Sequence, residues 1–540
     1  MLNRQTVTIW ALLGGAWLLP GCSADSAEAS DSMAGGGIPP SSYAESEPPI
    51  YPADQIDNAS NEGDRYEDVG TNAFVVAAHD PLSTFAVDVD TASYDIFRRD
   101  INDGVLPQPA SVRLEEYVNY FDYDYPKADA DAEVPFSIEL AAAPNLLERD
   151  TLVLRIGIQG KAAPEFVKRP ANLVFLVDVS GSMGSVDKLP LVQDVLLMSL
   201  SVLDPTDTIS IVTYASGTAV RLPPTPVSDR ATLEATIQSL AAGGSTAGAS
   251  GLTLAYEQAE AGFIEGGINH VLLCTDGDFN VGPSSTEELL SLIEQQRQTG
   301  VTLTALGFGV GNLNDAMMEA ITNSGNGVYA VISDADQAQT YVQDRLLSTM
   351  NFIAKDVRLQ VEFNPAEVYA YRLLGYENRA VLDEQYRDRT LDAGEIGAEH
   401  QVTALYEIVP NGTAVPSAED APEPEDGDPF DGTLLVSDDD LVLVKVAYKH
   451  PDAGVDDPIE EVSLSLTPSA VGDRVDALDS DFRFAVAVAA FAEILKQSPY
   501  ADPEILPQLD SIVGAPEHAA DPLRTEFVAL FRTARGLLGR

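Results

Sequence analysis

A repeated alternation between residues 171 and 351 constrains the fold of this chain more than any other feature. Apolar runs alternate there with segments of helical periodicity, and the runs read NLVFLVD, DTISIVTYA, AVRLPP, NHVLLCTD, VTLTALGFG and GVYAVIS. Strands that are apolar on both faces and separated by amphipathic helices predict a parallel sheet covered on both sides. We therefore expect an α/β fold with a doubly wound, mostly parallel sheet and one antiparallel edge hairpin around residues 213–222.

The rest of the 540-residue chain is too long to share one core with this sheet. Residues 22–80 are rich in Ser, Ala, Gly, Pro and acidic residues. Such a segment cannot bury enough apolar surface to fold, so we expect it to be a tether. A small α+β module follows the tether, and the C-terminal region alternates like a β-sandwich before a helical tail. The predicted divisions are a signal peptide (1–21), a disordered tether (22–80), the α+β module (81–168), the parallel-sheet domain (169–351) and the C-terminal region (352–540).

The N-terminus predicts export and lipid attachment. The apolar stretch Ile9–Leu19 is too short to span a bilayer and has the length of a secretory signal core. It ends in Leu-Pro-Gly-Cys, which resembles the lipobox of bacterial lipoproteins, so Cys22 is the expected lipidation site. Ser23 fits sorting to the outer membrane, and we expect a cell-envelope protein that contacts the membrane through its lipid anchor alone. An ordinary signal peptide is the alternative.

The net charge limits which partners the protein can bind, and the number of cysteines limits its disulfides. The chain has 85 acidic and 31 basic residues and a formal net charge of -54. Such a surface repels nucleic acid and favours cations or basic partners, although acidity also keeps proteins soluble. There are two cysteines. With Cys22 lipidated, Cys274 has no partner for a disulfide and is expected to be a buried apolar side chain.

Oxygen-bearing side chains gather where the predicted strands end. Asp178, Ser180 and Ser182 stand at alternate positions after the first strand, so they share one side of an extended turn. Thr246 and Asp276 follow at the same edge of the predicted sheet. Hydroxyls and carboxylates without His or Cys suit a hard cation, which predicts Mg²⁺, with Mn²⁺ or Ca²⁺ able to substitute.

This pattern resembles the metal-ion-dependent adhesion site of von Willebrand factor type A domains. The resemblance implies that Ser180 and Ser182 ligate the ion directly and Thr246 directly or through water. Asp178 and Asp276 are then expected to act mainly through water. One coordination position stays open for a carboxylate of a partner protein, so the implied outcome is a metal-bridged protein contact.

The flanking segments resemble a bacterial lipoprotein family called YfbK-like. The segments concerned include STFAVDVDTASYDIFRRDINDG, RLEEYVNYFDYDYP, EVYAYRLLGYENR and DFRFAVAVAAFAEIL. This resemblance implies the architecture and leaves the activity of the flanking modules open.

We therefore expect a lipid-anchored protein that binds another protein through a divalent cation. One alternative is a structural spacer in which the ion only stabilises loops. A metal-dependent hydrolase is a further alternative, but the sequence has no His-Glu-x-x-His motif and no Gly-x-Ser-x-Gly motif. The chain is accordingly expected not to be an enzyme.

Overall fold

A computed structural model provides the structure of the chain. The described residues are 8–9, 63–87, 90–129, 132–147, 149–161, 169–245, 248–277, 283–346, 351–391, 393–417, 421–422, 424, 429–430, 432–454, 457–475 and 478–539. They belong to one unit of the fold. Cys22, most of the predicted signal peptide and the first part of the predicted tether lie outside these residues.

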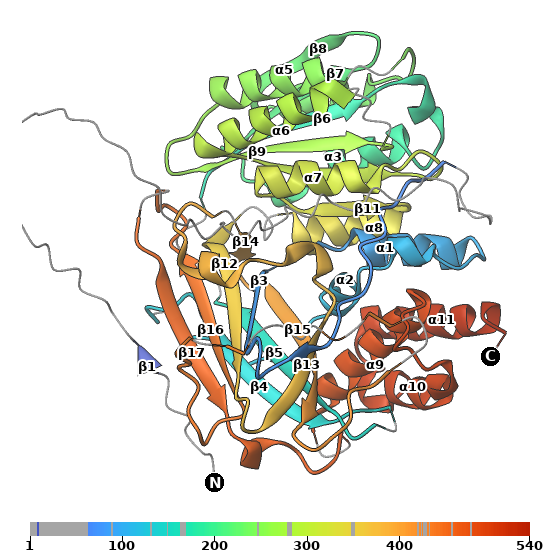
Figure 1. The fold of residues 1–540 in the computed structure, drawn as a ribbon. Helices are drawn as coiled ribbons and strands as arrows, with labels where there is room; N and C mark the ends of the chain where they lie inside the picture. Colours follow the sequence, from blue (N-terminus) through green and yellow to red (C-terminus); the bar gives the residue numbers. More distant parts are fainter. Residues whose placement is uncertain are drawn as a thin grey trace, which may run out of the picture. The chain divides into compact units, whose positions relative to one another are not determined.

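The central sheet has the strand order β11-β10-β9-β6-β7-β8. All neighbours are parallel except β7 and β8, which form the expected antiparallel edge. The prediction of a mostly parallel, doubly wound sheet is therefore confirmed (Figure 1). The strands are β6 (Ala171–Asp178), β7 (Thr208–Tyr214), β8 (Thr218–Pro226), β9 (Ile268–Thr275), β10 (Val301–Phe308) and β11 (Tyr329–Ile332).

Helices cover both faces of the central sheet. Strand residues alternate between two apolar cores: Phe175 packs on one face with α3, α4 and α8, and Leu176 packs on the other with α5, α6 and α7. Every residue of β6 is buried, as expected for a strand covered on both sides. The helices are α3 (Leu189–Val202), α4 (Arg230–Gln238), α5 (Gly248–Ala261), α6 (Pro283–Gln298), α7 (Asp315–Gly325) and α8 (Ala335–Thr340).

Two antiparallel sheets form a β-sandwich around a third core. One sheet contains β1 (Thr8–Ile9), β3 (Leu82–Ala86), β12 (Phe352–Phe363), β14 (Gly394–Gly397), β16 (Val442–Lys449) and β17 (Glu460–Leu466). The other contains β2 (Val75–Val76), β4 (Phe136–Pro144), β5 (Leu152–Gly160), β13 (Val368–Leu374) and β15 (Gln401–Pro410).

The sandwich corrects the predicted division into an N-terminal module and a separate C-terminal domain. β3 pairs with β12, with Phe85 opposite Leu359, and β5 pairs with β15, with Ile156 opposite Ala404. Strands from both sides of the parallel-sheet domain thus complete each sheet. The parallel-sheet domain is an insertion between β5 and β12 of one sandwich.

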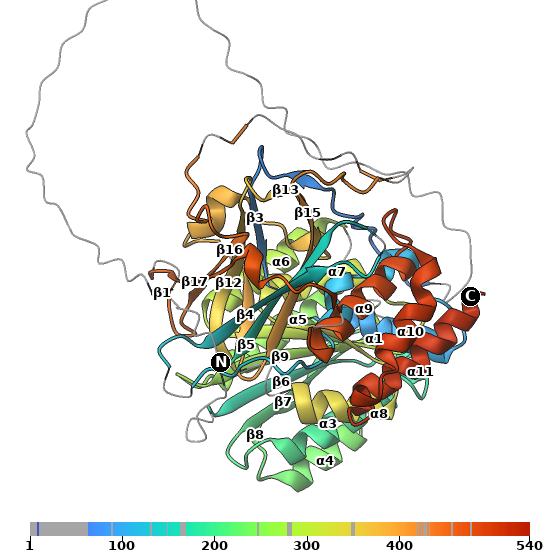
Figure 2. The same ribbon diagram turned by 90° about the horizontal axis from the view of Figure 1, so that it is seen from below.

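A helical layer is shared in the same way. α1 (Ala92–Asn102) and α2 (Leu114–Val118) precede the insertion, whereas α9 (Ser480–Leu495), α10 (Leu506–Val513) and α11 (Pro522–Leu537) end the chain. Their aromatic and aliphatic side chains form one core. Figures 1 and 2 show α9, α10 and α11 lying side by side. Among the described residues, no helix combines the length and the apolar character needed to cross a membrane.

Residues 63–80 correct the predicted end of the tether. Phe74 is fully buried, and Val75 pairs with Tyr371 of β13. Asp64 has no exposed side-chain surface. Residues 63–80, predicted as part of a disordered tether, are therefore folded, because a few of their apolar and charged side chains contact distant parts of the chain.

Candidate metal centre

The candidate centre lies where two neighbouring parallel strands end. β6 ends at Asp178, and β9 ends at Thr275, one residue before Asp276. The register pairs Val177 with Cys274, so both strand ends reach the same edge of the central sheet. This is the edge at which doubly wound sheets bind ligands.

Hydrogen bonds fold the first loop around its own carboxylate. Asp178 Oδ1 accepts from the Ser180 backbone N–H at 2.7 Å, and Oδ2 accepts from Thr275 Oγ1 at 3.4 Å. The Ser180 and Ser182 hydroxyl oxygens lie 3.0 Å apart. Ser180 is buried, whereas Ser182 is exposed. The loop therefore presents the Ser182 hydroxyl to solvent, beside the buried Ser180 and the buried Asp178 carboxylate.

The two carboxylates are held in different protonation environments. Burial raises the pKa of Asp178 to about 6 against hydrogen bonds from Ser180, and the charge of Asp276 adds to the rise. Burial also acts to raise the pKa of Asp276, but hydrogen bonds from Lys188 and Ser182, with the Lys188 charge, bring it below its ordinary value. Asp276 is thus the more firmly ionised of the pair.

Two residues that the sequence reasoning missed hold Asp276. Lys188 Nζ donates to Oδ2 at 2.9 Å, and Asn312 Nδ2 donates to the same oxygen at 3.3 Å. Lys188 is the N-cap residue of α3, where the helix dipole disfavours a cation. A basic residue at that position is a signal that could have led to Lys188, whereas no local pattern marks Asn312.

The Asn312 loop approaches the backbone of the centre closely. Gly277 has φ +94°, and a Cβ there would lie 2.5 Å from Leu313 Cα. Asp64 in turn accepts hydrogen bonds from the Gly311 and Leu313 backbone N–H groups at 2.9 and 2.8 Å. Asp64 therefore supports one wall of the candidate centre.

The remaining predicted ligand, Thr246, lies outside the described residues. The part of its loop that is described does reach the first loop: Gly181 N donates to Gly244 O at 3.0 Å, and Gly243 N donates to Val179 O at 2.8 Å. Four of the five predicted residues thus lie in described positions at one edge of the sheet.

The hydroxyl pair has a spacing that suits a hard cation. Octahedral Mg²⁺ with ligands at about 2.0–2.1 Å places adjacent oxygens about 2.9 Å apart, close to the 3.0 Å between Ser180 and Ser182. No group of three or more His, Cys, Asp or Glu side chains that could hold a metal occurs among the described residues. A metal at this edge would therefore need the serine oxygens as ligands.

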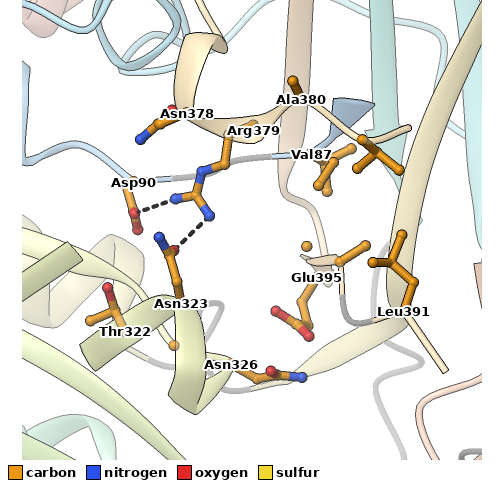
Figure 3. Close-up of a pocket in the computed structure, with 15 residues that line it drawn as sticks. Val87, Asp90, Thr322, Asn323, Asn326, Asn378, Arg379, Ala380, Leu391 and Glu395 are labelled. Carbon is orange, nitrogen blue, oxygen red and sulfur yellow. Dashed lines mark hydrogen bonds and ion pairs between the residues drawn. The ribbon is translucent and has the colours of Figure 1, made fainter. Parts of the chain in front are cut away.

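A separate cavity of about 270 Å³ lies next to α7 (Figure 3). Arg379 projects into it, pairing with Asp90 at 3.0 Å and with Asn323 Oδ1 at 2.6 Å. None of the predicted metal-site residues lines this cavity.

Cys274 is buried on β9, as expected from its apolar surroundings in the sequence, and burial raises the pKa of its thiol.

Comparisons with known families agree with this fold. Residues 172–344 match the von Willebrand factor type A domain, residues 60–155 match a family described as von Willebrand factor, and residues 348–537 match the C-terminal region of uncharacterized protein YfbK. The chain is thus a protein with a von Willebrand factor type A domain, as its resemblance predicted. It belongs to the YfbK family, because it is 38% identical over 484 residues to uncharacterized protein YfbK of Escherichia coli (strain K12), covering 88% of this chain and 81% of that protein.

Two more distant relatives match a smaller part of the chain or at lower identity. Human inter-alpha-trypsin inhibitor heavy chain H4 is 26% identical over 243 residues, which cover 43% of this chain and 26% of that protein. The solved structure of a von Willebrand factor type A protein from Catenulispora acidiphila has 15% identity and a TM-score of 0.41, covering 75% of this chain and 91% of that one. A type A domain suggests interaction with, or adhesion to, another protein.

Proposed function

We propose that this chain captures a partner protein through a divalent cation bound at the carboxyl edge of its central sheet. Mg²⁺ is the proposed ion, with Mn²⁺ or Ca²⁺ as substitutes, and the proposed ligand residues are Asp178, Ser180, Ser182, Thr246 and Asp276. The observation that supports this most is the exposed Ser182 hydroxyl, 3.0 Å from that of Ser180 and beside two buried carboxylates. A partner carboxylate would complete the coordination, so the proposed action is binding and not catalysis.

We also propose that Cys22 carries lipid and fixes the protein in the cell envelope, at the outer membrane. The tether then leaves the type A domain free to meet a partner away from the bilayer. Metabolic labelling with a palmitate analogue tests this step, because Cys22→Ala would abolish the label and release the protein from the membrane fraction. Equal labelling of both forms would contradict it.

The metal proposal is tested by titration calorimetry with Mg²⁺. Ser182→Ala removes a proposed ligand and is expected to weaken Mg²⁺ binding about tenfold, which corresponds to about 1.4 kcal/mol. Ser185→Ala is the matched control, because Ser185 is an exposed serine of the same loop outside the proposed ligand set. Absence of Mg²⁺ and Mn²⁺ uptake by the unaltered chain would refute the proposal.

Capture is tested separately with envelope extract and the immobilised protein. Partner recovery should need Mg²⁺, stop with a chelator and fail with Ser182→Ala. The spacer alternative predicts instead that Mg²⁺ raises thermal stability while recovery is unchanged by chelation. A hydrolase would show metal-dependent turnover of the captured partner.

A further inference from the structure

Lys188 reaches the candidate metal centre although it is not one of the proposed ligands. Its Nζ lies 2.9 Å from Asp276 Oδ2, and the two side chains are 7% and 0% exposed. Exposed ion pairs contribute little to protein energetics, but a buried pair is screened weakly by solvent. The Lys188 charge therefore acts on whatever binds beside Asp276.

The fold makes room for this lysine. A Cβ at Gly309 would lie 2.6 Å from Lys188 Cγ and 2.7 Å from Cε, so a side chain there would displace the stem. Gly309 also has φ +75°, which other residues adopt at a cost. The Lys188 side chain therefore packs closely against the backbone at Gly309 and is almost fully buried.

The charge balance shows what the lysine does. Asp178 and Asp276 are the carboxylates described at the centre, and together they would neutralise a divalent cation. Summed over these two carboxylates, Lys188 and a bound divalent cation, the formal charge is +1. An uncompensated positive charge with an open coordination position attracts an anion, whereas a neutral centre would not.

We propose that Lys188 keeps the candidate metal centre electropositive and thereby selects a carboxylate as the partner's ligand. This inference rests on the proposed function, because it assigns a role to Lys188 only when a cation is bound. It predicts opposite changes in the affinity for the cation and in the affinity for the carboxylate. Loss of the lysine charge should tighten cation binding, because the carboxylates act unopposed, and should weaken binding of the carboxylate partner.

Mn²⁺ and acetate are the probes that separate these effects. Mn²⁺ affinity is measured by electron paramagnetic resonance, and acetate entry is measured as the loss of water-proton relaxation enhancement when acetate displaces water from bound Mn²⁺. Lys188→Met is expected to lower the Mn²⁺ dissociation constant about tenfold and to raise the acetate concentration for half displacement about tenfold. Arg230→Met is the control, because it removes one positive charge from an exposed pair on α4.

Two further variants guard against a folding defect. Lys188→Gln keeps a hydrogen-bond donor without the charge and should behave like Lys188→Met, whereas Lys188→Arg keeps the charge and should approach the unaltered chain. Unchanged or weaker Mn²⁺ binding in folded Lys188→Met or Lys188→Gln would overturn the role of Lys188 and leave the proposed function standing. If the unaltered chain bound no Mn²⁺, the proposed function itself would fail.

Discussion

The Asp64 carboxylate offers the sharpest test of how distant residues support the candidate centre. Its Oδ1 accepts from the Gly311 and Leu313 backbone N–H groups, and its Oδ2 lies 3.0 Å from Arg99 Nη2. The Asp64 side chain is fully buried. Tyr66 Oη also donates to Asp64 Oδ2 at 3.2 Å. Replacing Asp64 with Ala removes these contacts together and leaves the Gly311 and Leu313 amides of the 309–314 loop without their side-chain acceptor.

The structure sets the size of the effect. Each backbone N–H group left without an acceptor costs about 1–3 kcal/mol where it stays buried. Arg99 keeps a second carboxylate, Asp100, at 2.8 Å, so its charge stays compensated. We therefore expect Asp64→Ala to favour opening of the loop by about 3 kcal/mol, equivalent to about a hundredfold change in the opening equilibrium.

Amide hydrogen exchange measures this opening directly. Protection of the Gly311 and Leu313 amides should fall about a hundredfold in Asp64→Ala, while amides of the central strands keep their protection. Asp64→Asn is the matched control, because its amide oxygen can still accept both N–H groups, and it should retain most of the protection. Equal protection of the loop amides in Asp64→Ala and the unaltered chain would refute the reasoning.

Three other substitutions probe the fold. Arg113→Met should lower the free energy of unfolding by about 3–5 kcal/mol in denaturant titration, because it strands buried carboxylates including Asp315, 2.6 Å from Arg113 Nη1; full retention of stability would contradict this. Burial lowers the pKa of His270 to about 3. Below about pH 6.5 the unfolded chain therefore binds a proton that the folded chain does not, so the free energy of unfolding decreases as the pH is lowered. Between pH 7 and pH 5, urea titration should show His270→Asn losing about 2 kcal/mol less than the unaltered chain, and equal losses would oppose the argument. Gly309→Ala should displace Lys188 and cost about 1–3 kcal/mol of stability, seen as a lower melting temperature, whereas an unchanged melting temperature would mean that Lys188 moves aside without cost.

The central sheet could be predicted because its strands carry their environment in their own sequence. A run such as β6 is apolar at successive positions because both faces of the strand are covered, which is the mark of a mostly parallel sheet between two helical layers. The sandwich could not be divided correctly in the same way. The alternating pattern shows that Phe85 and Leu359 each face a core. It does not show that these two residues, which are 359 − 85 = 274 positions apart, pair with each other.

In the candidate centre, too, residues that are close in sequence could be predicted and residues brought together by tertiary contacts could not. Asp178, Ser180 and Ser182 lie on one short segment, so their spacing alone places them on one side of a turn. Lys188 and Asn312 reach Asp276 through tertiary contacts, and a lysine before a helix or an asparagine in a loop is ordinarily a solvated side chain. The sequence therefore predicts the oxygen donors more readily than the groups that set their charge and orientation.

The interleaved fold also changes what the flanking regions contribute to binding. Asp64 and Arg113, from before the insertion, contact the 309–314 loop and the first turn of α7, and Arg379, from after it, bonds Asn323 of the same helix. These contacts converge on the segment that places Asn312 against Asp276. An excised type A domain would keep the serine loop but lose the support for this wall. Cation affinity measured on the excised domain would therefore describe a differently constrained centre from that of the whole chain.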